Sequence, residues 1–193
     1  RAAGLPAGPA EDAARDTLAL EVEHGAGLRI LTTLLAGRRH LDMPRPDLAA
    51  GAGVTVQSTG HLLLIARPLA GLACADPSRV LRVTGAGEGL VMAPALITAS
   101  ETTGAELCLS SAYRGCVAHV SPSGDGAALW LGATPAGPVT LELRTAPASH
   151  PLPAHHTGAA QRRGAWSAAA RAGVYVEHRH WDLLTGQSSR YLV

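Results

Sequence analysis

Three amino acids are missing from this 193-residue chain, which contains no Lys, no Asn and no Phe, so that all 16 basic residues are Arg. These amino acids are encoded by AT-rich codons, and their absence indicates a very GC-rich genome rather than a functional demand. It has a physical consequence, because aromatic residues make up only 3% of the chain. The core must then be built from Leu, Val and Ala, which bury less area per residue than large aromatics do.

Charge is also scarce, since charged residues make up 16% of the chain and the net charge is +1. A nucleic-acid interface needs a clustered basic excess, so this balance predicts none. The sequence has no run of 18 apolar residues, and we therefore expect no membrane-spanning helix. The hydrophobic fraction of 47% is that of an ordinary globular protein with a packed core.

Complete catalytic motifs are missing as well. The glycines within 85–89 do not have the spacing of a dinucleotide-binding loop, and we interpret them as a hairpin loop. Ser110 and Ser111 could be combined with His119 and Asp125 into a triad, but no G-x-S-x-G elbow surrounds either serine. The sequence therefore predicts no catalytic residue.

Metal-binding and disulfide patterns are incomplete in the same way. His178 and His180 alternate along a predicted strand, but a zinc site needs a third and usually a fourth ligand, and the spacing supplies none. The cysteines are odd in number and form no C-x-x-C pair, which favours buried free thiols in a reducing compartment and leaves one disulfide open. They are Cys74, Cys108 and Cys116. We expect no metal and no cofactor.

Short apolar runs with period-2 alternation dominate the middle of the chain, separated by Gly and Pro turns. This pattern is typical of an antiparallel β-barrel or β-sandwich, so the predicted fold class is all-β with few short helices, for example jelly-roll-like. No regular succession of helices and strands indicates a doubly wound sheet. The predicted strands cover 17–23, 28–35, 54–56, 61–66, 79–84, 106–109, 115–120, 128–131 and 139–144.

The composition divides the chain into four parts. We expect a flexible N-terminal segment at 1–16 and a β-domain at 17–145. A Pro-, His- and Arg-rich linker follows at 146–164. The tail at 165–193 begins with one or two helical turns and then alternates like a strand over 174–181. We expect this tail to pack on the β-domain or on a partner.

One stretch of sequence resembles a known family. Tyr113-Arg114-Gly115, followed by an apolar strand, is similar to the hairpin motif of dUTPases. Ala93-Pro94-Ala95-Leu96 lies upstream at a distance similar to that in the herpesvirus form of the enzyme. The resemblance covers about 80–120 and implies a dUTPase-like β-barrel in a viral protein.

The residue three positions before the motif's Tyr is an Asp in the nucleotide site of the family, and here it is Ser110. The family's phosphate-contacting segments and glycine-rich terminal arm have no counterpart either. Since a dUTPase needs carboxylates to hold Mg²⁺, the resemblance implies a non-catalytic member. Such members bind host or viral proteins, in tegument or regulatory roles. This implies a location in the host-cell nucleus or cytoplasm, or in the virion.

The predicted function is therefore that of a protein-interaction module for a host or viral partner. We choose the candidate binding residues of this module by residue type alone, because Trp, Tyr and Arg are enriched among the residues that dominate protein–protein binding. A structural virion or phage protein, such as a capsid, tail or decoration component with a jelly-roll-like fold, is the alternative, and a homo-oligomer stays open. The candidate binding residues are Tyr113, Arg114, Trp130 and Trp181.

Overall fold

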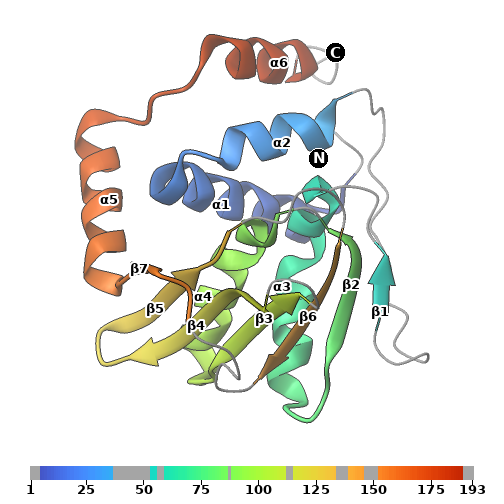
Figure 1. Cartoon of the computed structure of the whole chain (residues 1–193). Helices are drawn as coiled ribbons and strands as arrows, with labels where there is room; N and C mark the ends of the chain where they lie inside the picture. The colour runs from blue at the N-terminus through green and yellow to red at the C-terminus, as the bar shows by residue number, and fades with distance from the viewer. Residues whose placement is uncertain are drawn as a thin grey trace.

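A computed structural model describes residues 5–36, 53–55, 59–86, 88–111, 115–133, 139–145 and 152–188. In this part of the chain one seven-stranded sheet is covered on one face by helices (Figure 1). The prediction of an all-β barrel or sandwich is wrong, because six α-helices accompany the sheet and the sheet is open. The fold is mixed α and β.

The sheet combines one parallel pair of strands with five antiparallel pairs. Its strands are β1 (Gly53–Thr55), β2 (Leu81–Ala86), β3 (Leu107–Ser111), β4 (Gly115–Ser123), β5 (Gly126–Leu131), β6 (Val139–Thr145) and β7 (His155–Thr157). Their spatial order is β1-β2-β6-β3-β4-β5-β7, with β1 and β2 parallel. The strands predicted at 54–56, 79–84, 106–109, 115–120, 128–131 and 139–144 correspond to β1–β6, with ends shifted by a few residues.

Figure 1 shows some helices behind the sheet, a pair above it in this view, and an arm that runs up one side and ends above that pair. The helices are α1 (Ala7–His24), α2 (Gly27–Leu35), α3 (Thr59–Ala75), the 3-10 helix η1 (Gly89–Met92), α4 (Ala93–Thr103), α5 (Ala159–Ala172) and α6 (His178–Ser188). α3 and α4 pack on the strands, and α1 packs on both of them. None of the helices in the described ranges is long and apolar enough to cross a membrane. The boundaries expected at 16/17 and 164/165 fall inside α1 and α5.

The strand predicted at 17–23 is part of α1. Leu18, Leu20 and Val22 alternate with polar neighbours, but the residues that α1 buries are Ala13, Asp16, Thr17 and Leu20. Their spacing of three, one and three residues is that of one helix face. Leu18, at 47% exposure, lies outside that face, so the period-2 pattern was coincidental.

Two more predicted strands, 28–35 and 61–66, lie in α2 and α3. In α3 the apolar run continues on both sides of Arg67 and Pro68, and Leu69 is buried like the residues before it. A continuous apolar run has no period that separates a buried strand from a buried helix. The predicted strand ends at 66, just before Arg67 and Pro68, but Pro68 lies inside the helix. The strand predicted at 174–181 is wrong too, because α6 begins at His178.

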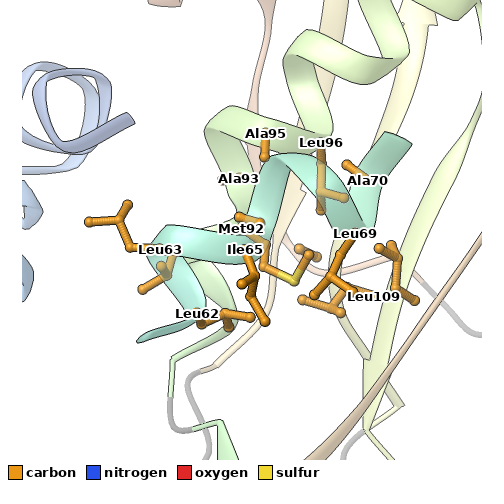
Figure 2. Packing of buried hydrophobic residues seen from close by; sticks show 14 of the residues in the cluster. Leu62, Leu63, Ile65, Leu69, Ala70, Met92, Ala93, Ala95, Leu96 and Leu109 are labelled. Carbon is orange, nitrogen blue, oxygen red and sulfur yellow. The ribbon is translucent and has the colours of Figure 1, made fainter. Parts of the chain in front are cut away.

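The core lies between α3, η1, α4 and the sheet, and it is aliphatic, as the composition predicted. Figure 2 shows side chains of α3 and of the η1–α4 segment meeting Leu109 of β3. One buried ion pair accompanies it: Asp16 of α1, 1% exposed, accepts hydrogen bonds from Arg67 of α3 at 3.1 and 2.6 Å. Burial raises the pKa of this carboxyl, and Arg67 opposes the rise.

The close packing of α2 on α1 generates the first testable prediction. A Cβ at Gly27 would lie 1.9 Å from the carbonyl oxygen of Thr17 and 2.8 Å from the amide nitrogen of Glu21. Backbone atoms cannot turn aside as side chains do. Gly27→Ala should therefore lower the free energy of unfolding by at least about 1–3 kcal/mol, the range typical of overpacking.

Gly71→Ala is the matched control, because nothing lies within 4 Å of a Cβ at this position of α3. It should leave the stability unchanged or raise it by up to about 1 kcal/mol. Urea unfolding followed by circular dichroism measures both variants. Equal stability of the two variants would contradict the close packing of α1 and α2.

Candidate functional site

The face of the sheet opposite the helices carries a cross-strand row of reactive and aromatic side chains. On neighbouring strands each member lies directly opposite the next. The residues beside them in β3, β4 and β5 belong to or pack against the helix-side core, and side chains alternate along a strand. This polar row consists of Arg144 (β6), Cys108 (β3), His119 (β4), Trp130 (β5) and His156 (β7).

A β-bulge brings a second thiol into contact with this row. The β3–β4 register shifts by one residue, which leaves Val117 as an extra residue in β4. Val117 and Ala118 both pack in the core, so that Cys116 and His119 on either side of them are both turned to the opposite face. A regular strand would place residues three apart on opposite faces.

The bulge packs against a glycine. A Cβ at Gly89, the first residue of η1, would lie 2.4 Å from Cγ1 of Val117 and 3.2 Å from Cδ2 of Leu109. The inward turn of Val117 is therefore accommodated by the missing side chain of Gly89. The contact between Gly89 and Val117 therefore affects both the packing of the core and the position of the thiols on the other face of the sheet.

The two thiols are free and almost inaccessible, with Cys108 at 0% and Cys116 at 8% exposure. A hydrogen bond from Cys116 lowers the pKa of the Cys108 thiol; burial opposes this, and His119 and Arg144 lower the pKa further, to about 5. The same hydrogen bond, together with burial, raises the pKa of Cys116. The pair therefore titrates as a unit, holding one proton and one negative charge at neutral pH.

His119 is the cationic partner of this thiolate. The side chain is 2% exposed, and its Nε2 lies 2.7 Å from Oε1 of Glu106. Burial lowers the pKa of the imidazole, but the Cys108 sulfur and the Glu106 carboxylate outweigh burial and raise it. Nδ1 is buried, and it is the ring nitrogen left for the hydrogen bond between His119 and Cys108. The neighbouring sulfur and carboxylate thus favour the protonated form of the imidazole beside the Cys108 sulfur.

Aromatic rings close the row on the β5 side. The Trp130 ring is tilted over the His119 ring at 5.5 Å between centroids, and over the His156 ring at 4.8 Å. His156 belongs to β7, which leads directly into α5. A shift of α5 would therefore move His156, which contacts Trp130, the ring that covers His119.

Arginines fasten α5 to the β4–β5 hairpin. Arg162, 6% exposed, donates to the carbonyl oxygen of Ala127 and, at 2.9 Å, to Oε1 of Glu101 in α4. Arg163 donates to the carboxylate of Asp125 at 2.8 Å. These bonds hold α5, and with it β7, against the sheet.

The residues singled out in the sequence lie in different places. Tyr113 and Arg114 lie outside the described residues. Trp130 is half-buried in the polar row, where it stacks on histidines. Trp181 is 56% exposed and belongs to α6, which packs on α2 away from β5 (Figure 1). The structure therefore does not bring Trp130 and Trp181 together.

The serine triad considered in the sequence is not assembled. Ser110 shares the polar face of β3, but the carboxylate that pairs with His119 is that of Glu106, while Asp125 pairs with Arg163. The segment at 85–89 is not a hairpin loop, because β2 pairs with β1 and β6 and the chain continues into η1 and α4.

Sequence reasoning missed the thiol site. Two strands with a short connection were predicted at 106–109 and 115–120, and these contain Cys108, Cys116 and His119. The signal was therefore a hairpin that carries two cysteines and a histidine. The bulge that brings the three side chains together has no sequence signature of its own.

In the part of the chain that the structure describes, no group of three or more His, Cys, Asp or Glu side chains could hold a metal ion. No family model, curated protein or solved structure matches the chain. The geometry defines a paired-thiol site with an adjacent histidine.

The charge state of the thiols can be measured directly. Because the pKa of Cys108 is lowered to about 5, thiolate ultraviolet absorbance should be present at neutral pH and disappear as the pH falls through about 5. Cys108→Ser should remove this step and move the remaining thiol of the pair back towards an ordinary value, about 8.5. Cys74→Ser, which changes a thiol outside the pair, should leave the step intact. A folded wild-type protein without thiolate absorbance below pH 8 would contradict the assignment.

Proposed function

We propose that this protein is a thiol redox protein in which Cys108 and Cys116 interconvert between a dithiol and an intramolecular disulfide. The observation that carries the proposal is the bulge in β4, which places both sulfurs on one face of the β3–β4 hairpin, in hydrogen-bonding contact. Forming a disulfide from this arrangement requires the two sulfurs to move together within one hairpin.

The electrostatics of the site support this chemistry. The thiolate is the reactive form of cysteine, and a nearby cation stabilises it. Here His119 and Arg144 both act on the Cys108 sulfur. A reactive thiolate with a second thiol beside it is the arrangement that turns oxidation into a disulfide rather than into irreversible products.

A hydrolase or transferase with Cys108 as nucleophile fits less well. Such an enzyme needs a cleft beside the nucleophile in which a substrate carbonyl can sit. Cys108 is completely buried, and the groove of about 400 Å³ lined by Cys74 lies between α3 and α4, on the other side of the sheet. Burial favours a reaction that stays within the hairpin. The sequence prediction that the chain carries no catalytic residue stays a prediction.

The disulfide can be tested with the native full chain in redox buffers of increasing potential. We expect the loss of two hydrogen atoms by mass spectrometry. Trypsin cleaves after Arg114, between the two cysteines, so oxidised protein should yield peptide 83–114 linked to peptide 115–144. Reduction should separate these peptides.

Two variants control this experiment. Cys74→Ser should form the same linked peptides, whereas Cys116→Ser should form none. If the native wild-type chain yields no 108–116 link even in strongly oxidising buffer, the proposal is wrong.

A second candidate is the protein-interaction role implied by the dUTPase resemblance. The observation that favours it is the distribution of exposed large apolar residues, since five of the eight in the described ranges lie between 166 and 183. They share the α5–α6 arm: Trp166, Val174, Tyr175, Trp181 and Leu183. Because the fold is not an all-β barrel, this candidate rests on the exposed arm, with a host or viral protein as the partner.

Light scattering of the full chain separates this role from that of a structural virion protein. An interaction module for another protein should be monomeric at micromolar concentration. A closed homo-oligomer that dissociates in Tyr175→Ala/Trp181→Ala, but not in the control Leu18→Ala on α1, would favour the structural alternative instead.

A further inference from the structure

We infer that the oxidant of the Cys108–Cys116 pair is a small hydroperoxide, with Cys108 as the attacking sulfur, His119 as the proton donor and Cys116 as the resolving thiol. This inference rests on the proposed function, because it names the substrate of the same site. Three features of the polar row carry it: the depth of the sulfurs, the contact of His119 with the Cys108 sulfur and the placement of the second thiol.

The depth of the sulfurs limits the size of the oxidant. Cys108 is 0% and Cys116 is 8% exposed, and His119 between them and Trp130 is 2% exposed. In thiol–disulfide exchange the attacking, central and leaving sulfurs must lie nearly in line, so the reaction with a protein disulfide or glutathione disulfide depends on access. Hydrogen peroxide is close to water in size, so it needs a smaller opening of the hairpin to reach the Cys108 sulfur than either disulfide does.

The second ring nitrogen of His119 supplies a proton donor next to the sulfur. Nε2 is held by Glu106 at 2.7 Å, which leaves the buried Nδ1 for the hydrogen bond between His119 and Cys108. An oxygen bound at the Cys108 sulfur would lie within reach of the same N–H group and would accept its hydrogen bond more strongly than sulfur does. A disulfide presents only sulfur to this donor, which is a weak acceptor.

The reaction balances with these groups alone. The Cys108 thiolate attacks the terminal oxygen of the hydroperoxide, an S–O bond forms and the O–O bond breaks. The departing oxygen takes the proton from Nδ1 of His119 and leaves as water or an alcohol. The sulfur is oxidised by two electrons to a sulfenic acid, and the peroxide bond is reduced.

The second step closes the disulfide. Cys116 attacks the Cys108 sulfur, an S–S bond forms and the S–O bond breaks. The hydroxide that leaves takes the Cys116 proton and becomes water. One hydroperoxide and two thiols thus give one disulfide, one water and one further water or alcohol. Arg144, opposite Cys108 on β6, adds positive charge next to the sulfur while negative charge moves onto the leaving oxygen.

The test compares oxidants on the reduced full chain. Hydrogen peroxide and glutathione disulfide are each reacted with the wild type and with free cysteine, and rates are expressed per thiolate, which removes the effect of the lowered pKa. We expect peroxide to react about 100-fold faster with the protein than with free cysteine, the contribution typical of a positioned proton donor. Glutathione disulfide should react more slowly with the protein than with free cysteine.

Variants separate the roles. In Cys116→Ser, peroxide should convert Cys108 to a sulfenic acid that a dimedone probe traps, and no disulfide should form. His119→Gln should lose the rate advantage per thiolate. Glu106→Gln changes a half-buried residue that holds the ring from outside, and should lower the rate and shift its pH profile even if the His119 variant does not fold.

The outcomes distinguish this inference from the proposed function. If glutathione disulfide produces the 108–116 disulfide and peroxide reacts no faster per thiolate than with free cysteine, the inference is wrong and the redox proposal stands. If neither oxidant produces the disulfide, the redox proposal itself is wrong. If peroxide is fast but a folded His119→Gln is equally fast, His119 is not the proton donor.

Discussion

Val117, the extra residue in β4, determines which side chains of this strand lie on each face of the sheet. Val117 and Ala118 turn inward together, and Val117 packs against Gly89, where no side chain competes for the space. The same inversion turns Cys116 and His119 to the opposite face. If β4 had no bulge, the register of the Ser110–Cys116 pair would continue along the strands. Cys108 would then lie opposite Ala118 and not opposite His119. Packing in the core therefore fixes the chemistry of the polar row.

The charges of the polar row are stable in their buried position only as a set. A thiolate or an imidazolium alone would lose its hydration and revert to the neutral form. Here each charge has a partner, because Cys108 faces His119 and Arg144, and His119 faces Glu106. Such an arrangement contributes less to stability than well-packed apolar residues can. Buried sets of titratable groups of this kind are found more often at functional sites than elsewhere in proteins.

The sequence predicted the strands well where turn residues and alternation coincide, as in β2, β4 and β6. It failed for α1 and α3. In α1, Leu18 and Val22 imitate a strand although the burial follows a helix. In α3 the apolar run has no period at all, and Pro68 resembles a stop. The all-β fold followed from these errors and from the dUTPase resemblance. The thiol site was out of reach because a bulge is set by tertiary packing and not by local composition.

The two helices of the C-terminal arm are attached to different parts of the molecule. Arg162 and Arg163 of α5 bind the β4–β5 hairpin beside the thiols, and β7 leads directly into α5. α6 follows after residues 173–177, which form neither helix nor strand, and it packs on α2. A chain that ended after α5 would keep every residue of the polar row and lose the exposed Tyr175 and Trp181. One truncation would therefore separate the paired thiols from the exposed apolar residues of the arm beyond α5.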